Sequence, residues 1–139
     1  EQTTGLFGLD VFCGNGYGSH LLSRELGCAM WGMDGSAEAV RFADEHYADD
    51  AVYFSHKLFP FRLPAGRADF ALSMESIEHV EQDDDFLATV AGAVRPGGLV
   101  FLSTPNRHVI DLERNPNKFH VRHYGRAEVD ELARRHGLR

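Results

Sequence analysis

Short apolar runs alternate with segments of helical period along the whole chain. The apolar runs predict five strands, at residues 6–12, 29–33, 52–54, 68–73 and 99–103. The segments that follow them place apolar residues three or four positions apart, which predicts helices at 17–26, after Ser36, at 84–94 and at 126–136. Strands that alternate with helices are typical of βαβ units, so we expect an α/β fold around a mostly parallel sheet.

Residue types at the element ends refine this pattern. Leu22 and Leu26 share one face of the first predicted helix. The sequence RPGG at 95–98 is expected to end the third helix before the last strand begins at Leu99. Residues 104–125 are polar, interrupted by Pro and Asn, and too long for a plain connector, so they predict a working loop or lid.

Length and composition predict one domain over residues 1–139. A hydrophobic fraction of 43% with 25% charged residues is that of a globular protein with one sizeable core. No apolar run approaches the roughly 20 residues of a membrane span, and no signal-peptide pattern opens the sequence. The chain stops after a helix where a further strand is expected, so we interpret the domain as incomplete.

Net charge and cysteine content bear on the class of partner and on the cellular compartment. The net charge of −7 disfavours nucleic acid, which would need clustered Lys and Arg. Cys13 and Cys28 have no CxxC spacing, which indicates a reducing and therefore cytoplasmic compartment rather than a disulfide scaffold or a zinc site.

The first predicted strand runs into a glycine-rich turn. Gly14, Gly16 and Gly18 leave the backbone open just before a helix, where N–H groups attract a carboxylate or phosphate. Asp34 ends the second strand 20 residues after Gly14, at the place where an acid accepts hydrogen bonds from both hydroxyls of a ribose. Together they predict a nucleoside cofactor; a tight turn and a loop acid without ligand are the structural alternatives.

These residues resemble the motifs of the class I S-adenosylmethionine-dependent methyltransferases. The segments that carry the resemblance are LDVFCGNGYG (9–18), GMDGS (32–36), ADFALSMESIEHV (68–80), AVRPGGLVFLSTPN (93–106) and NKFHVRHYGRAEVDELARRHG (117–137). Their order along nearly the whole chain makes the resemblance specific. It implies a Rossmann-like, doubly wound sheet with helices on both faces, of which the last two strands are lacking.

The resemblance also implies the cofactor and its ligands. S-adenosylmethionine would be held by Asp10, Cys13, Gly14, Asn15, Gly16, Tyr17, Asp34, Gly35, Ser36 and Met74. The methyl acceptor would be an oxygen of a small molecule or a glycan. Core packing is the alternative role for Met74, and a small buried residue is the alternative for Cys13.

Departures from the family pattern, the lack of the last strands among them, suggest an alternative function. Phe12 stands where the family usually has its first glycine, and no acid follows the third strand near Ser55 and His56 to hold the adenine. The chain would then be a methyltransferase-like binding or scaffold module without catalysis. A dinucleotide-binding domain fits less well, because its third glycine would fall at Ser19.

Histidines supply the candidate catalytic groups. Methyl transfer mainly requires alignment of the acceptor with the methyl group, and an oxygen acceptor also needs a base. His79, His120 and His123 lie in segments expected at the carboxyl ends of the strands, where open α/β sheets bind ligands. A structural role, a hydrogen bond to a backbone carbonyl that fixes the lid, is the alternative for His120.

The sequence ExxEH places Glu75, Glu78 and His79 on one predicted helical turn. It resembles the metal-assisted site of quinone-pathway O-methyltransferases. Two carboxylates and one imidazole leave the ligand set short, so we predict no resident metal and expect Glu78 and His79 to brace this turn. A divalent ion on Glu75, Glu78 and His79 is the alternative.

Overall fold

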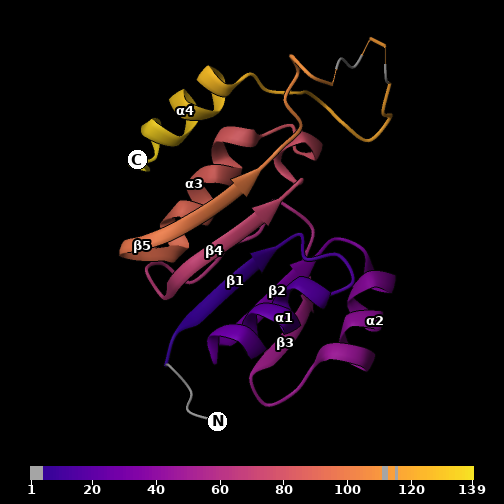
Figure 1. The fold of residues 1–139 in the computed structure, drawn as a ribbon, viewed down its shortest axis with the longest axis vertical. Helices are drawn as coiled ribbons and strands as arrows, with labels where there is room; N and C mark the ends of the chain where they lie inside the picture. Colours follow the sequence, from indigo (N-terminus) through magenta and orange to yellow (C-terminus); the bar gives the residue numbers. More distant parts are fainter. Residues whose placement is uncertain (1–4, 111–112, 115) are drawn as a thin grey trace.

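A computed structural model describes residues 5–110, 113–114 and 116–139. Figure 1 shows the elements in chain order: β1 (Phe7–Val11), α1 (Tyr17–Leu26), β2 (Ala29–Asp34), α2 (Ala37–Tyr47), β3 (Val52–His56), β4 (Ala68–Met74), the 3-10 helix η1 (Ile77–His79), α3 (Asp83–Ala93), β5 (Val94–Ser103) and α4 (Arg126–Arg135). The predicted alternation of strands and helices is confirmed.

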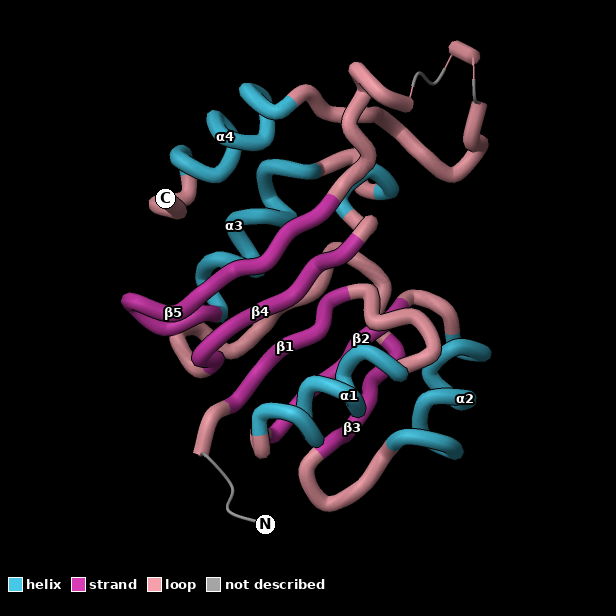
Figure 2. The backbone as a smooth tube through the Cα atoms, viewed as in Figure 1, coloured by secondary structure: helices cyan, strands magenta, loops and turns pink. Residues whose placement is uncertain are grey.

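The five strands form one parallel sheet in the order β3-β2-β1-β4-β5 (Figure 2). The chain builds outward from β1 to β3 and then returns to the other side of β1 to place β4. Strand order therefore reverses between β1 and β4, and in open parallel sheets a ligand crevice forms at the carboxyl ends of such a pair. The fold class is confirmed.

Side chains from the two faces of the sheet make two cores. On one face, Leu9 and Val11 of β1 pack with Phe86 of α3 and Leu132 of α4. On the other face, residues of β2 and β3 pack with Val40 and Ala43 of α2. Helices therefore cover both faces, as in a doubly wound fold.

Leu22 and Leu26 share one face of α1, as predicted, since both line the groove beside this helix, but Leu26 is 43% exposed and the side chains that α1 buries are those of Ser19 and Ser23. One local prediction is wrong. Strand β5 begins at Val94, which pairs with Ala68, and the register shifts before Leu99. The RPGG segment is thus an irregularity inside the edge strand and not a separate turn.

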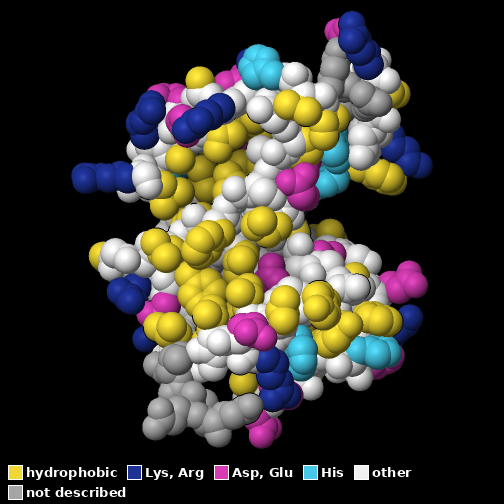
Figure 3. Space-filling model, viewed as in Figure 1, with side chains coloured by type: hydrophobic (Ala, Val, Ile, Leu, Met, Phe, Trp, Pro, Cys, Tyr) yellow, Lys and Arg dark blue, Asp and Glu magenta, His cyan; other side chains and the backbone are white. Residues whose placement is uncertain are grey.

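An apolar groove of about 530 Å³ lies beside α1, over β4 and β5. Leu99 and Phe101 are 60% and 48% exposed there. Figure 3 shows a continuous hydrophobic surface across the middle of this view.

None of the helices in the described ranges has the length and apolar character needed to cross a membrane.

Candidate functional site

The glycine turn and the end of β2 meet at one point. The Gly14 amide donates a 2.9 Å hydrogen bond to Asp34 Oδ2, and the Cys13 amide donates to the Met33 carbonyl at 3.0 Å. The Ser36 amide donates to Asp34 Oδ1 at 2.8 Å. Each carboxylate oxygen keeps a further lone pair, so Asp34 remains able to accept hydrogen bonds from a ligand.

Gly14 and Gly16 serve this turn in different ways. Both have positive φ values, 57° and 82°. A Cβ on Gly14 would meet nothing within 4 Å, so its missing side chain leaves open space for a ligand. A Cβ on Gly16 would lie 2.6 Å from both the Ala43 Cβ and the Phe54 ring. Gly14 therefore gives access, and Gly16 permits close packing.

Phe12 does not separate the glycine turn from Asp34. Its φ of 62° is the left-handed conformation that glycine adopts easily, which explains the family's preference at this position. The ring stacks on Phe86 with centroids 5.4 Å apart and meets Phe61 edge-on at 6.5 Å. The side chain thus packs toward the core formed with α3.

Asp10 is buried beneath the turn rather than presented to solvent. It is 8% exposed, and its Oδ2 accepts a 2.7 Å hydrogen bond from the Ser19 hydroxyl of α1. Burial raises the pKa of Asp10 above 3.8, and the Ser19 hydrogen bond only partly opposes this. Asp10 therefore ties β1 to α1 and supports the turn from below.

This raised pKa predicts a pH-dependent loss of stability. The folded state holds the proton of Asp10 more tightly than the unfolded state does. The stability that the protonated side chain contributes is therefore fully present below pH 3.8 and is lost as the pH rises through the pKa of the folded state. We expect wild type to lose stability relative to Asp10→Asn as the pH rises from about 4 to 7, measured by urea unfolding. Ser19→Ala should steepen the loss, and parallel curves for all three proteins would contradict the assignment.

The other predicted cofactor residues surround this point. Ser36 caps α2, with its hydroxyl accepting from the Ala39 amide at 3.2 Å. Asn15 and Tyr17 are exposed at the start of α1, and Met74 is 51% exposed at the end of β4. Gly35 lies beside Leu58. Burial and nearby carboxylates raise the pKa of Cys13, so its thiol stays protonated and is no nucleophile.

Three histidines gather across the crevice, at the end of β4. The rings of His79 and His120 have centroids 4.7 Å apart, and those of His120 and His123 5.0 Å apart. His79 Nδ1 lies 2.8 Å from the Phe119 carbonyl. Because a carbonyl only accepts, Nδ1 carries the proton and Nε2 of the neutral ring has a free lone pair.

The same reasoning orients the other two rings. His123 Nδ1 donates to the Ile110 carbonyl at 2.8 Å, so its Nε2 accepts from His120 Nδ1 at 2.7 Å. His123 is 8% exposed and holds His120 in place. Partial burial and the neighbouring His79 lower the pKa of His120, which favours its neutral form.

Glu78 lies beneath these histidines, and Glu75 does not. Glu78 is 1% exposed; its Oε2 accepts from the Thr104 hydroxyl at 3.0 Å, and its Oε1 has no hydrogen-bond partner among the described residues but lies 4.0 Å from His79 Nε2. Residues 75–79 are not one helical turn, since η1 spans only Ile77–His79 and Glu75 has a φ of 50°. The Glu75 carboxylate instead accepts from the Ser103 hydroxyl at 2.7 Å.

Residues that sequence analysis did not select attach the lid segment to α3. Asp83 Oδ2 accepts from Arg122 Nη1 at 2.7 Å and from the Tyr124 hydroxyl at 2.9 Å. The Val121 amide also donates to the Glu78 carbonyl at 2.7 Å. These bonds bring His120 and His123 to His79. The signal that the sequence offers for these contacts is the acid-rich first turn of α3, with Asp83, Asp84 and Asp85.

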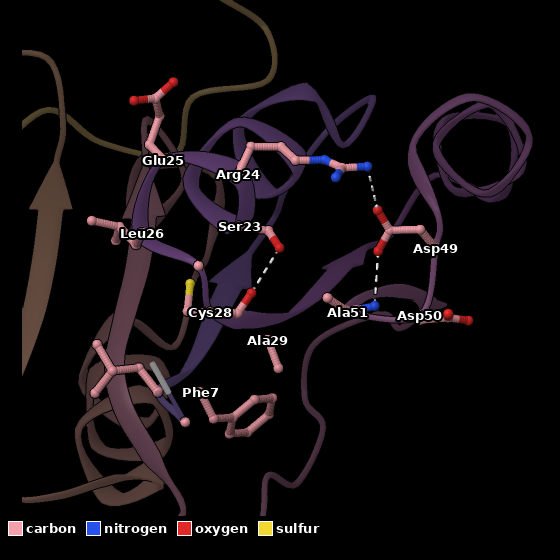
Figure 4. Close-up of a pocket in the computed structure, with 13 residues that line it drawn as sticks. Phe7, Ser23, Arg24, Glu25, Leu26, Cys28, Ala29, Asp49, Asp50 and Ala51 are labelled. Carbon is pink, nitrogen blue, oxygen red and sulfur yellow. Dashed lines mark hydrogen bonds and ion pairs between the residues drawn. The ribbon is translucent and has the colours of Figure 1, made fainter. Parts of the chain in front are cut away.

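Two cavities lie at opposite ends of the sheet. A cavity of about 390 Å³ is lined by Phe12, which precedes the glycine turn, and by Leu58, His79 and Val121. A larger one of about 640 Å³ lies at the amino ends of β1 and β2 (Figure 4). Its lining includes the Arg24–Asp49 ion pair but none of the predicted site residues, whereas the predicted site residue His79 lines the smaller cavity.

Comparisons with known proteins agree with this geometry. A family model described as a methyltransferase domain matches residues 4–139. The "Ubiquinone biosynthesis O-methyltransferase" of Sinorhizobium fredii is 38% identical over 110 residues, which are 77% of this chain and 44% of that protein. The protein of the same description from Caulobacter vibrioides is 36% identical, over 74% of this chain and 42% of that protein. The chain thus spans less than half the length of these relatives.

Solved structures share the fold at low sequence identity. The YcgJ protein of Bacillus subtilis has a TM-score of 0.81 and 19% identity, covering 98% of this chain and 63% of its own. Phosphoethanolamine N-methyltransferase 2 of Haemonchus contortus, solved with S-adenosyl-L-methionine, has a TM-score of 0.77 and 19% identity, covering 99% of this chain and 34% of its own.

Proposed function

Because the chain belongs to the class I S-adenosylmethionine-dependent methyltransferases, we propose that it is the cofactor-binding core of an enzyme that transfers a methyl group to an oxygen of a small molecule. The observation that carries the proposal is the meeting of the Gly14 amide and Asp34 at the point where strand order reverses. Backbone N–H groups and a carboxylate at that point suit the methionine part and the ribose of the cofactor.

The acceptor would lie between this point and the histidines. His79 lines the cavity that reaches Phe12, and its Nε2 lone pair is able to receive the proton of a hydroxyl. The names of the relatives support O-methylation of a small molecule. A glycan hydroxyl is the second acceptor class that we propose. His120 and His123 would position His79 and the lid. Cys13 and Cys28 are both free, which supports a reducing, cytoplasmic setting.

Titration calorimetry with S-adenosylhomocysteine tests the cofactor assignment. We expect the 139-residue chain to bind it with micromolar affinity. A folded full-length protein that does not bind would favour a module without catalysis, the alternative suggested by Phe12 and by the lack of an acid near His56.

Substitution of His79 tests the acceptor side. We expect His79→Gln to lower methyl transfer to an ortho-diphenol probe by about 100-fold in the full-length protein, because a positioned base contributes roughly 10²- to 10⁴-fold. Affinity for S-adenosylhomocysteine should not change. His46→Gln, on the exposed surface of α2, is the control. Equal loss in both variants, or none in either, would remove His79 from the site.

A further inference from the structure

Asp83, the first residue of α3, is fixed by contacts on both of its carboxylate oxygens. Oδ1 accepts a 2.9 Å hydrogen bond from the Asp84 amide at the start of the helix, where a negative charge is favourable. Oδ2 accepts from Arg122 Nη1 at 2.7 Å and from the Tyr124 hydroxyl at 2.9 Å. A side chain that is held from its own helix thus serves two donors of the lid segment.

The two donors are held in place as well. Tyr124 is 5% exposed, and burial together with the Asp83 carboxylate raises the pKa of its hydroxyl, so this group stays protonated and donates. Arg122 Nη2 donates to the Glu81 carbonyl at 2.8 Å, so the guanidinium bridges two acceptors at the start of α3. Loss of the Asp83 carboxylate would leave both donors without this acceptor.

The residues just before Arg122 reach the acceptor side of the candidate site. The Val121 amide donates to the Glu78 carbonyl at 2.7 Å, and the Val121 side chain lines the cavity that His79 also lines. The ring of His120 lies 4.7 Å from that of His79. Because His120 and Val121 directly precede Arg122 in the chain, the contact of Arg122 with α3 sets where both side chains lie.

The same turn of α3 also supports the cofactor side. Phe86 lies three positions after Asp83 and therefore on the same side of the helix. Its ring stacks on Phe12, which precedes the glycine turn, with centroids 5.4 Å apart. One turn of α3 thus contacts the lid segment through Asp83 and the approach to the glycines through Phe86.

We propose that Asp83 is a positioning residue for methyl transfer, which holds Val121 and His120 of the lid segment against the acceptor cavity through its contacts with Arg122 and Tyr124. This role rests on the proposed function, whereas the anchoring of the segment does not. Asp83 acts through these residues and not on the acceptor itself. When the segment is in place for only a fraction of the time, the apparent affinity for the acceptor falls by that fraction.

Steady-state kinetics of the full-length protein with an ortho-diphenol acceptor test this role. We expect Asp83→Asn to raise the KM for the acceptor by about 10-fold and to lower kcat by less than about 3-fold, because the acceptor must then order a segment that wild type holds in place. Affinity for S-adenosylhomocysteine should not change. Arg122→Met should behave as Asp83→Asn does, and Arg122→Lys should recover part of the loss, since it keeps the charge but not the bridge between two acceptors.

Asp84→Asn is the matched control. Asp84 lies in the same helical turn and is also paired with an arginine, but that partner is Arg135 of α4, at 2.9 Å, and not a residue of the lid segment. We expect this variant to keep the KM of wild type.

Hydrogen exchange of the Val121 amide provides a readout that needs no activity. This amide is protected by its bond to the Glu78 carbonyl only while the segment lies against the turn after β4. We expect Asp83→Asn to speed the exchange by about 10-fold or more and Asp84→Asn to leave it as in wild type. A thermal melt of each variant separates local release of the segment from unfolding of the domain.

The proposal requires both changes in Asp83→Asn and neither in Asp84→Asn. An unchanged KM, an unchanged exchange rate of Val121, or an equal effect of Asp84→Asn would overturn it. A wild-type protein that transfers no methyl group would refute the proposed function, and faster Val121 exchange in Asp83→Asn would still demonstrate the anchoring of the segment.

Discussion

Asp34→Ala is expected to weaken binding of S-adenosylhomocysteine by about 100-fold. The side chain would accept from two ribose hydroxyls, and each hydrogen bond to a charged group contributes about 1.5 to 3 kcal/mol. It also holds the Gly14 amide at 2.9 Å and the Ser36 amide at 2.8 Å, so its loss loosens the turn as well. Titration calorimetry measures the change in affinity.

Asp49→Ala is the matched control for this substitution. Asp49 is also an acid beside the sheet, but it lies at the amino ends of the strands, paired with Arg24. We expect its variant to bind the ligand as wild type does. An Asp34→Ala protein with unchanged affinity would show that the ribose is held elsewhere.

Gly16→Ala is expected to destabilise the fold by about 2 to 5 kcal/mol. A left-handed conformation costs a residue with a Cβ about 1 to 2 kcal/mol, and overpacking adds about 1 to 3 kcal/mol. Both apply at Gly16, because its φ is 82° and the new Cβ would lie 2.6 Å from Ala43 and from Phe54. Urea unfolding measures the loss.

Gly14→Ala provides the comparison from the same turn. Its φ of 57° carries only the conformational cost, about 1 to 2 kcal/mol, because the new Cβ would meet open space. That space is where the ligand is proposed to lie, so we expect Gly14→Ala to lose affinity while it stays folded. A Gly14→Ala protein with full affinity would mean that the ligand does not approach this part of the turn.

Most of the fold was predictable because each element repeats a local pattern. Strands and helices follow apolar periodicity, and Ser36 marks the start of α2 as a cap. The start of β5 was not predictable, since a register shift between Ala68 and Phe70 depends on the neighbouring strand. The buried face of α1 likewise depends on the direction in which the glycine turn delivers the helix.

Some features of the candidate site were likewise predictable from the sequence, and others were not. Gly14 and Asp34 were predictable because the turn and the acid each lie at a strand end. The orientation of Glu75 was not, because its left-handed φ is a single-residue feature that periodicity does not register. Contacts from Asp83 to Arg122 and Tyr124 span 39 and 41 residues, so only the folded chain reveals them.

The crossing of the chain from β3 to β4 bears on how the protein folds. The amide of Phe7, at the start of β1, donates a hydrogen bond to the Asp69 carboxylate of β4, 62 residues away, and Gly8 pairs with Phe70. A topology with such distant pairings folds slowly, since the entropy cost of closing a large loop comes before the contacts that offset it. During synthesis, half of the crevice does not exist until β4 has emerged. A ligand that needs both sides of the crevice would therefore bind only the finished sheet and would stabilise the folded state by mass action.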